Sequence, residues 1–89
     1  MNDPDATLRR RLTYSSRRRG TKELDLVLGP FADAHLERLG GAELARFAAL
    51  LEAPEPDLYA WICGAPAPPE YEHGVLEAIR RFAAAGRRA

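Results

Sequence analysis

The sequence holds little of what a β-sheet requires. Only four of its 89 residues are Val or Ile and three are Thr, so the β-branched side chains that favour strands are scarce. The strong helix formers Ala, Leu, Arg and Glu are abundant instead. These proportions and the short length predict an all-α fold, a compact bundle of about five short helices in one domain spanning residues 1–89. We expect its ends, residues 1–4 and 86–89, to be flexible.

Cysteine is almost absent too. The one cysteine, Cys63, excludes an intramolecular disulfide and any multi-cysteine metal site. It ends the apolar run 59–63, which predicts a buried small hydrophobe rather than a reactive thiol. We expect Tyr59, Trp61 and the three Phe residues to form the centre of the core.

Long hydrophobic runs are missing as well. No stretch approaches the roughly 20 apolar residues of a membrane span, and no apolar signal-peptide segment follows the N-terminal charges. Segment 8–19 has the Arg- and Ser-rich composition of a mitochondrial presequence, but Asp3 and Asp5 stand where presequences avoid acidic residues. The sequence therefore predicts a cytosolic protein without membrane insertion.

Side chains able to perform acid–base or nucleophilic chemistry are few. His35 lies on an apolar stripe, which predicts a core or interface position, and His73 lies near a helix start, which predicts a surface position. Neither has a second histidine at metal-ligand spacing, and the glycines form no phosphate- or dinucleotide-binding pattern. The sequence predicts no catalytic residue, no metal site and no intrinsic cofactor, and hence a protein that is not an enzyme.

Apolar spacing and helix-breaking residues predict five helical segments. Pro30 lies inside the second, where its missing backbone donor predicts a kink or a junction between two short helices. A stiff proline-rich connector at 65–69 precedes the last helix. The expected segments cover residues 4–16, 24–39, 42–51, 57–64 and 70–84.

Charge is unevenly distributed along the chain, although the formal net charge is zero. Residues 1–22 hold six Arg and one Lys against two Asp, a net of +5, and residues 23–89 hold six Arg against eleven acidic residues, a net of −5. The basic segment could contact phosphates of a nucleic acid or another anionic surface, or it could be a solvated helix face. The sequence pI of 6.7 argues against nucleic acid, although a helix-turn-helix is compatible with the pattern.

The stretch Arg19-Gly20-Thr21-Lys22-Glu23 follows the basic run and has two interpretations. Structurally, Gly20 permits a tight turn or a helix cap, and Glu23 and Asp25 put negative charge in a first helical turn, where the helix dipole favours it. This interpretation accounts for Gly20 and Glu23 but not for Arg19. Functionally, the stretch would present Arg19 and Glu23 to a partner.

Two stretches together carry a family resemblance. The first contains Tyr14, Arg18-Arg19-Gly20, Glu23-Leu24-Asp25-Leu26, Leu28 and Phe31. The second is Glu52-x-Pro54-x-Pro56-Asp57-Leu58-Tyr59-x-Trp61. Over residues 8–82 the chain resembles the succinate dehydrogenase assembly factor 2 family, also called FAD assembly factors. Thr21 departs from the family pattern, which has a larger apolar residue at that place.

The resemblance implies an assembly chaperone. Members bind the flavoprotein subunit of succinate dehydrogenase, and in bacteria also that of fumarate reductase, and promote covalent attachment of FAD to a histidine of that subunit. FAD would thus be handled through the partner, and the protein would act as a monomer. Carried over by position, Arg18, Arg19, Gly20, Glu23 and Asp25 are the expected partner-binding residues.

Two alternative functions come from other classes. The first is a small nucleic-acid-binding or antitoxin-like regulator that uses the basic N-terminal segment. The second is a protein-interaction module with no connection to flavin. Binding to nucleic acid that weakens steeply with salt would favour the regulator.

Overall fold

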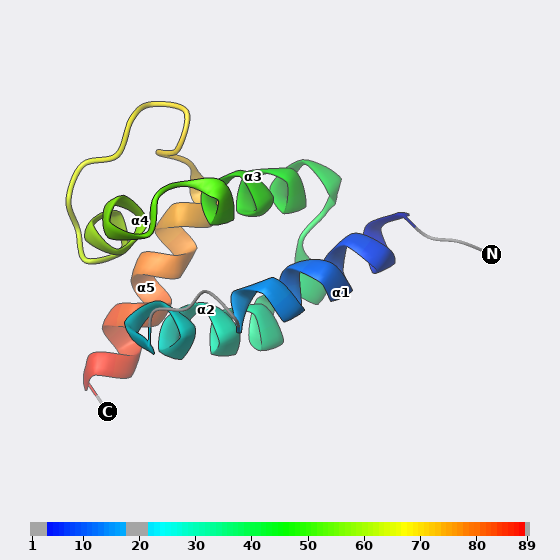
Figure 1. Ribbon diagram of the computed structural model, residues 1–89, viewed down its shortest axis with the longest axis horizontal. Coiled ribbons are helices and arrows are strands. Elements are labelled where there is room, and N and C mark those ends of the chain that lie inside the picture. The colour runs from blue at the N-terminus through cyan, green and yellow to red at the C-terminus, as the bar shows by residue number, and fades with distance from the viewer. Residues whose placement is uncertain (1–3, 18–21, 89) are drawn as a thin grey trace.

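The computed structural model describes residues 4–17 and 22–88, and residues 1–3, 18–21 and 89 lie outside that description. Within the described residues every regular element is helical (Figure 1), so the all-α prediction is confirmed. The elements are α1 (Pro4–Ser16), α2 (Lys22–His35), the 3₁₀ helix η1 (Leu36–Arg38), α3 (Gly41–Glu52), α4 (Glu55–Ile62) and α5 (Gly74–Arg88). Of the ends expected to be flexible, Pro4 lies in α1 and residues 86–88 lie in α5.

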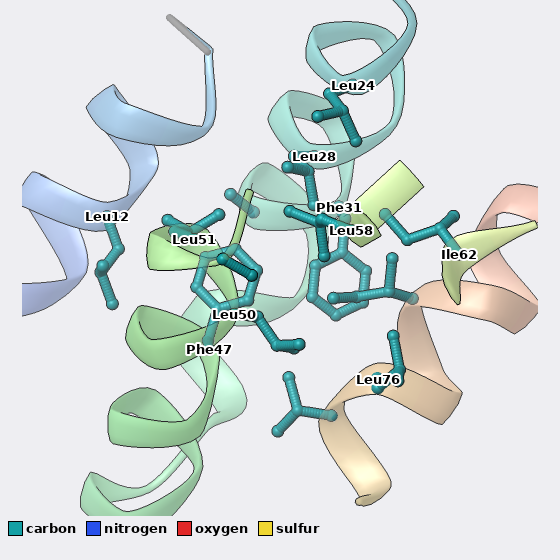
Figure 2. Packing of buried hydrophobic residues seen from close by; sticks show 14 of the residues in the cluster. Leu12, Leu24, Leu28, Phe31, Phe47, Leu50, Leu51, Leu58, Ile62 and Leu76 are labelled. Atoms are coloured by element: carbon teal, nitrogen blue, oxygen red, sulfur yellow. The ribbon is translucent and has the colours of Figure 1, made fainter. Parts of the chain in front are cut away.

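The helices pack around one apolar centre. Helix α1 lies along α2 and also contacts α3, while α5 crosses α2, α3 and α4 (Figure 1). Figure 2 shows leucine and phenylalanine side chains from α2, α3, α4 and α5 converging between the ribbons. At the centre, the Phe31 ring stacks on Phe47 with centroids 5.8 Å apart and meets Phe82 edge-on at 5.7 Å. Phe31 and Phe47 are buried, and each such side chain contributes about 1.5–3 kcal/mol relative to an exposed one.

The sequence left two expectations open at Pro30: a kink within one helix, or a junction between two short helices. A junction between two short helices is wrong, because α2 is one helix from Lys22 to His35 with Pro30 inside it. Pro30 is exposed, and so is the Leu26 side chain one turn earlier, at 65%. The Leu26 carbonyl, which would accept the missing hydrogen bond, is therefore on a face that water can reach.

Two residues at α4 that were expected in the core are exposed. Tyr59 is 39% exposed and Cys63 is exposed, whereas the apolar run 59–63 predicted both to be buried. The core-facing stripe of α4 is Leu58, Trp61 and Ile62, at the i, i+3, i+4 spacing of one helix face. Tyr59 and Cys63 are four residues apart, and both fall on the outer face.

Gly64 ends α4 in the left-handed region, with φ of 114°. The Gly64 amide donates to the Trp61 carbonyl at 3.1 Å and the Ala65 amide to the Ala60 carbonyl at 2.9 Å. These two bonds form a Schellman motif, in which glycine is favoured because it lacks a Cβ. The expected helix of 57–64 is displaced by two residues at each end: α4 spans Glu55–Ile62, and Gly64 lies just after its cap residue, Cys63.

Replacing Gly64 with Ala is expected to lower the free energy of unfolding by about 1–2 kcal/mol, measured by urea denaturation. No atom lies within 4 Å of the added Cβ, so the loss would come from the backbone conformation alone. Gly86→Ala in α5 is the matched control, because there the same methyl group is also uncrowded and favours a helix. A Gly64→Ala protein as stable as the wild type would contradict this account.

Helix α5 begins at Gly74, four residues later than expected, and continues to Arg88. His73 caps it: the Leu76 amide donates to His73 Nδ1 at 3.3 Å. Burial first and the nearby Arg46 second lower the pKa of His73, which keeps this acceptor nitrogen available at neutral pH. The half-buried His73 is therefore a capping residue rather than a plain surface residue.

Arg80 fastens the proline-rich connector to α5. Its guanidinium donates to the Trp61 carbonyl at 2.8 Å, the Ala65 carbonyl at 3.0 Å and Glu72 Oε1 at 2.7 Å. Glu72 Oε2 in turn accepts a bond from the Ala67 amide at 3.0 Å. One partly buried arginine thus joins the end of α4, the connector and α5.

Candidate functional site

Glu23 and Asp25 open α2, in the first turn that the sequence predicted. Glu23 is exposed and Asp25 is half-buried. Both carboxylates suit the positive end of the helix dipole. The other three expected partner-binding residues, Arg18, Arg19 and Gly20, lie outside the described residues.

Tertiary packing brings Glu23 to the start of α4. Glu23, Glu55, Pro56 and Tyr59 line a cavity of about 300 Å³ between the two helices. Glu23 belongs to the first stretch of the sequence resemblance, and Pro56 and Tyr59 belong to the second. Two stretches some thirty residues apart therefore share one surface.

Exposed apolar side chains accompany the carboxylates on this surface. Leu26, 65% exposed, follows Glu23 by three residues and so lies on the same side of α2. Tyr59 contributes an exposed ring from α4. We call Glu23, Leu26, Glu55, Pro56 and Tyr59 the α2–α4 surface.

Two explanations of the α2–α4 surface can be compared. The helix dipole accounts for the acidic residues, since Glu23 and Glu55 both lie in first turns. It does not account for an exposed Leu26 and Tyr59 beside them. Aromatic and apolar groups with a polar rim are typical of protein-binding surfaces. The sequence interpretation missed Leu26 and Tyr59 as site residues, because apolar residues inside a helical pattern were assigned to the core.

The basic segment divides into structural and solvent-facing arginines. Arg9 donates to the Leu36 carbonyl at 3.0 Å and the Leu39 carbonyl at 2.8 Å, which fastens α1 to the end of the α2–η1 unit. Arg17 pairs with Asp33 on α2, with Nη2 2.5 Å and 2.6 Å from the carboxylate oxygens. Neither role was visible in the sequence, where both residues belong to one uniform run of charge.

The histidines carry no sign of catalytic or metal chemistry. His35 packs between Phe31 and Phe82, with ring centroids 4.9 Å and 5.7 Å away, as expected of a core or interface histidine. Within residues 4–17 and 22–88, no three His, Cys, Asp or Glu side chains gather as metal ligands would. No helix in the same residues is long and apolar enough to cross a membrane.

The fold defines the class as a small all-α domain, and an apolar and acidic surface lies between its α2 and α4. Comparison with known families makes the class specific. The profile of the family described as flavinator of succinate dehydrogenase matches residues 10–83. The chain belongs to this family.

Individual relatives agree with the family match. The chain is 39% identical over 74 residues to the mitochondrial succinate dehydrogenase assembly factor 2 of Dictyostelium discoideum, covering 82% of this chain and 52% of that protein. It is 35% identical over 83 residues to the corresponding protein of Drosophila grimshawi, covering 90% and 56%. It is 49% identical over 47 residues to the FAD assembly factor SdhE of Aliivibrio fischeri, covering 53% and 55%. The chain spans about half the length of these curated relatives.

Proposed function

We propose that this protein is an assembly chaperone that binds the flavoprotein subunit of succinate dehydrogenase and promotes covalent attachment of FAD to it. The observation that carries the proposal is the family match over residues 10–83. The relatives' names, which specify succinate dehydrogenase assembly and FAD assembly, point to the same role. The flavoprotein subunit of fumarate reductase is a second proposed partner.

The proposed docking surface comprises Arg18, Arg19, Gly20, Glu23 and Asp25 together with the α2–α4 surface. Support comes from the exposure of Glu23 and from the neighbouring exposed Leu26 and Tyr59. Apolar side chains would supply contact area, and the carboxylates would fix orientation against cationic groups of the partner. Gly20 would let the partner's backbone approach closely, since it has no Cβ.

In this proposal the protein is not an enzyme and holds no cofactor of its own. The bond to FAD forms in the flavoprotein's own active site. The chaperone binds one conformation of the immature subunit more tightly than others and thereby raises the population of the conformation in which FAD and the acceptor histidine meet. Its residues orient the partner rather than transfer protons or electrons.

The deciding experiment measures covalent flavin directly. Cells lacking this protein would be compared with the same cells carrying it, and the flavoprotein subunit would be examined by flavin fluorescence on a denaturing gel. We expect a fluorescent band of the flavoprotein's size only when this protein is present. Equal fluorescence in both strains, at equal amounts of flavoprotein, would overturn the proposal.

Two finer points stay predictions. A monomer is expected, because docking to a partner does not need a second copy of the chain; sedimentation equilibrium measures this. A cytosolic location is expected from the sequence, and cell fractionation measures it.

A further inference from the structure

A second surface lies between α1 and α2, apart from the α2–α4 surface. It is a cavity of about 550 Å³. One wall bears Arg10 and Tyr14 of α1 and Arg17 directly after it, and the other includes Asp33 of α2 with Leu36 and Glu37 of η1. We call this cavity the α1–α2 cleft.

The α1 wall is a regular helical stripe. Arg10, Tyr14 and Arg17 follow the i, i+4, i+7 spacing: Arg10 and Tyr14 lie on one side of α1, and Arg17 continues that side in the turn directly after Ser16. Tyr14 is 60% exposed, the second largest exposure among the large hydrophobic side chains that the structure describes. Arginine and tyrosine are the residue types enriched in energetically dominant contacts of protein interfaces.

The charges of this wall are available to a ligand. Arg10 is exposed, and its side chain makes no hydrogen bond or ion pair with any described residue. Arg17 is paired with Asp33, but the side chains are 57% and 49% exposed. Exposed pairs contribute little to stability, so a carboxylate of a ligand could replace Asp33 at small cost.

The shape of the cleft is fixed by contacts beneath it. Arg9 holds α1 to the carbonyls of Leu36 and Leu39, and Leu36 is buried. The cleft is therefore preformed, which reduces the ordering cost of binding. Its floor is apolar and its α1 rim is cationic.

We propose that the α1–α2 cleft binds an acidic segment of the partner flavoprotein subunit, with Arg10 and Arg17 each pairing with a carboxylate and Tyr14 packing between them. This inference rests on the proposed function and adds a second contact to it. Arg10 lies in α1 and Arg17 directly follows its end, so at a rise of about 1.5 Å per residue the two arginines stand roughly 10 Å apart, which sets the spacing of the partner's carboxylates. The net charge of +5 over residues 1–22 complements such a segment.

Nucleic acid fits the cleft less well. A phosphate backbone carries negative charge at every step, so it would place phosphates against Asp33 and Glu37 as well as against the arginines. A protein segment can instead present a neutral or basic residue to those two carboxylates. The mixed charge of the cleft therefore favours an acidic peptide over DNA or RNA.

The test compares two double variants of equal charge. Arg10→Gln with Arg17→Gln removes both cleft cations, and Arg46→Gln with Arg81→Gln removes two exposed arginines from α3 and α5. Affinity for the purified flavoprotein subunit would be measured by titration calorimetry at salt concentrations from about 50 to about 200 mM. Ionic contacts weaken measurably over this range. We expect the cleft variant to bind at least roughly tenfold more weakly with a shallower salt dependence, and the control to stay within about twofold.

The outcomes separate this inference from the proposed function. If the wild type binds the flavoprotein and the cleft variant binds equally well, the inference fails and the function stands. If the wild type does not bind, the proposed function fails.

Binding of an acidic peptide to the cleft can be tested without the flavoprotein, by nuclear magnetic resonance titration with a hexaglutamate peptide. Hexalysine is the control peptide. Amide shifts confined to residues 10–17 and 32–37, and lost in the cleft variant, would support it. Scattered shifts, or a stronger response to duplex DNA, would overturn it.

Discussion

Replacing Arg80 with Met should lower the free energy of unfolding by about 3 kcal/mol. The substitution keeps an unbranched chain of similar length but removes the donors to the Trp61 and Ala65 carbonyls. A hydrogen bond from a charged donor contributes about 1.5–3 kcal/mol, and the Trp61 carbonyl would keep its bond from the Gly64 amide. For a domain of this size the loss corresponds to a fall in Tm of roughly 12–20 °C, which thermal unfolding followed by circular dichroism would measure.

The neighbouring Arg81 provides the control. Its side chain is 80% exposed and its pair with Glu77 is long, at 3.7 Å, so Arg81→Met should change stability by less than about 0.5 kcal/mol. Arg80→Lys should fall between the two, because a single ammonium cannot reach both carbonyls and Glu72. Equal Tm values for Arg80→Met and Arg81→Met would show that the connector does not depend on this guanidinium.

The same network predicts a pH dependence. Hydrogen bonds from Arg80 first, and from the Ala67 amide second, lower the pKa of Glu72 to about 2. Between pH 4.5 and pH 2 the unfolded chain binds more protons at this site than the folded chain, so stability falls as the pH falls through that range. In Arg80→Met the slope of stability against pH should be shallower there, measured by urea unfolding at several pH values.

Replacing Glu23 with Arg should weaken binding of the flavoprotein subunit about 30-fold or more. Reversal of this charge would set a cation against the cationic group that we propose faces it, and like charges across an interface cost several kcal/mol. A change of about 2 kcal/mol is roughly a 30-fold change in Kd. Titration calorimetry measures the effect.

A bulky replacement of Gly20 should abolish binding of the flavoprotein subunit, while the circular dichroism spectrum stays helical.

Glu43→Arg is the matched control for the Glu23 variant. Glu43 also lies in a first helical turn, that of α3, where its carboxylate accepts a bond from the Gly40 amide at 3.3 Å. The two reversals should therefore destabilise their helices by similar amounts, about 0.5–1 kcal/mol. Only Glu23→Arg should impair binding. If both variants bind as the wild type does, the docking surface lies elsewhere.

Helix positions followed from local sequence to a large extent. Helix α1 has the expected bounds of 4–16, and the glycine at 64 indicated the end of α4 to within two residues, since α4 ends at Ile62. Both depend on neighbours within a few residues, which a sequence displays directly. The sequence placed the start of α5 at Glu70, four residues before its actual start at Gly74. Histidine is not a usual capping residue, so His73 did not mark the helix start.

Which face of a short helix is buried could not be predicted. In α4 the residues from Tyr59 to Cys63 are nearly all apolar, so the apolar pattern does not indicate which face of the helix is buried. Packing against α5 and α2 buries Leu58, Trp61 and Ile62 and leaves Tyr59 exposed. That choice is what makes Tyr59 available to the α2–α4 surface.

By itself the sequence determined the helical class, the bounds of α1, the acidic first turn at Glu23 and Asp25, and the resemblance to a family that the profile match then confirmed. Only the tertiary structure showed that Glu23 lies beside Tyr59. It also showed that Arg9 and Arg80 donate hydrogen bonds to carbonyls of other elements, while Arg10 faces solvent. The physical reason is the range of the interactions. Caps and helix stripes depend on residues one turn apart, whereas these contacts join residues 19 to 36 positions apart and exist only after the helices have packed.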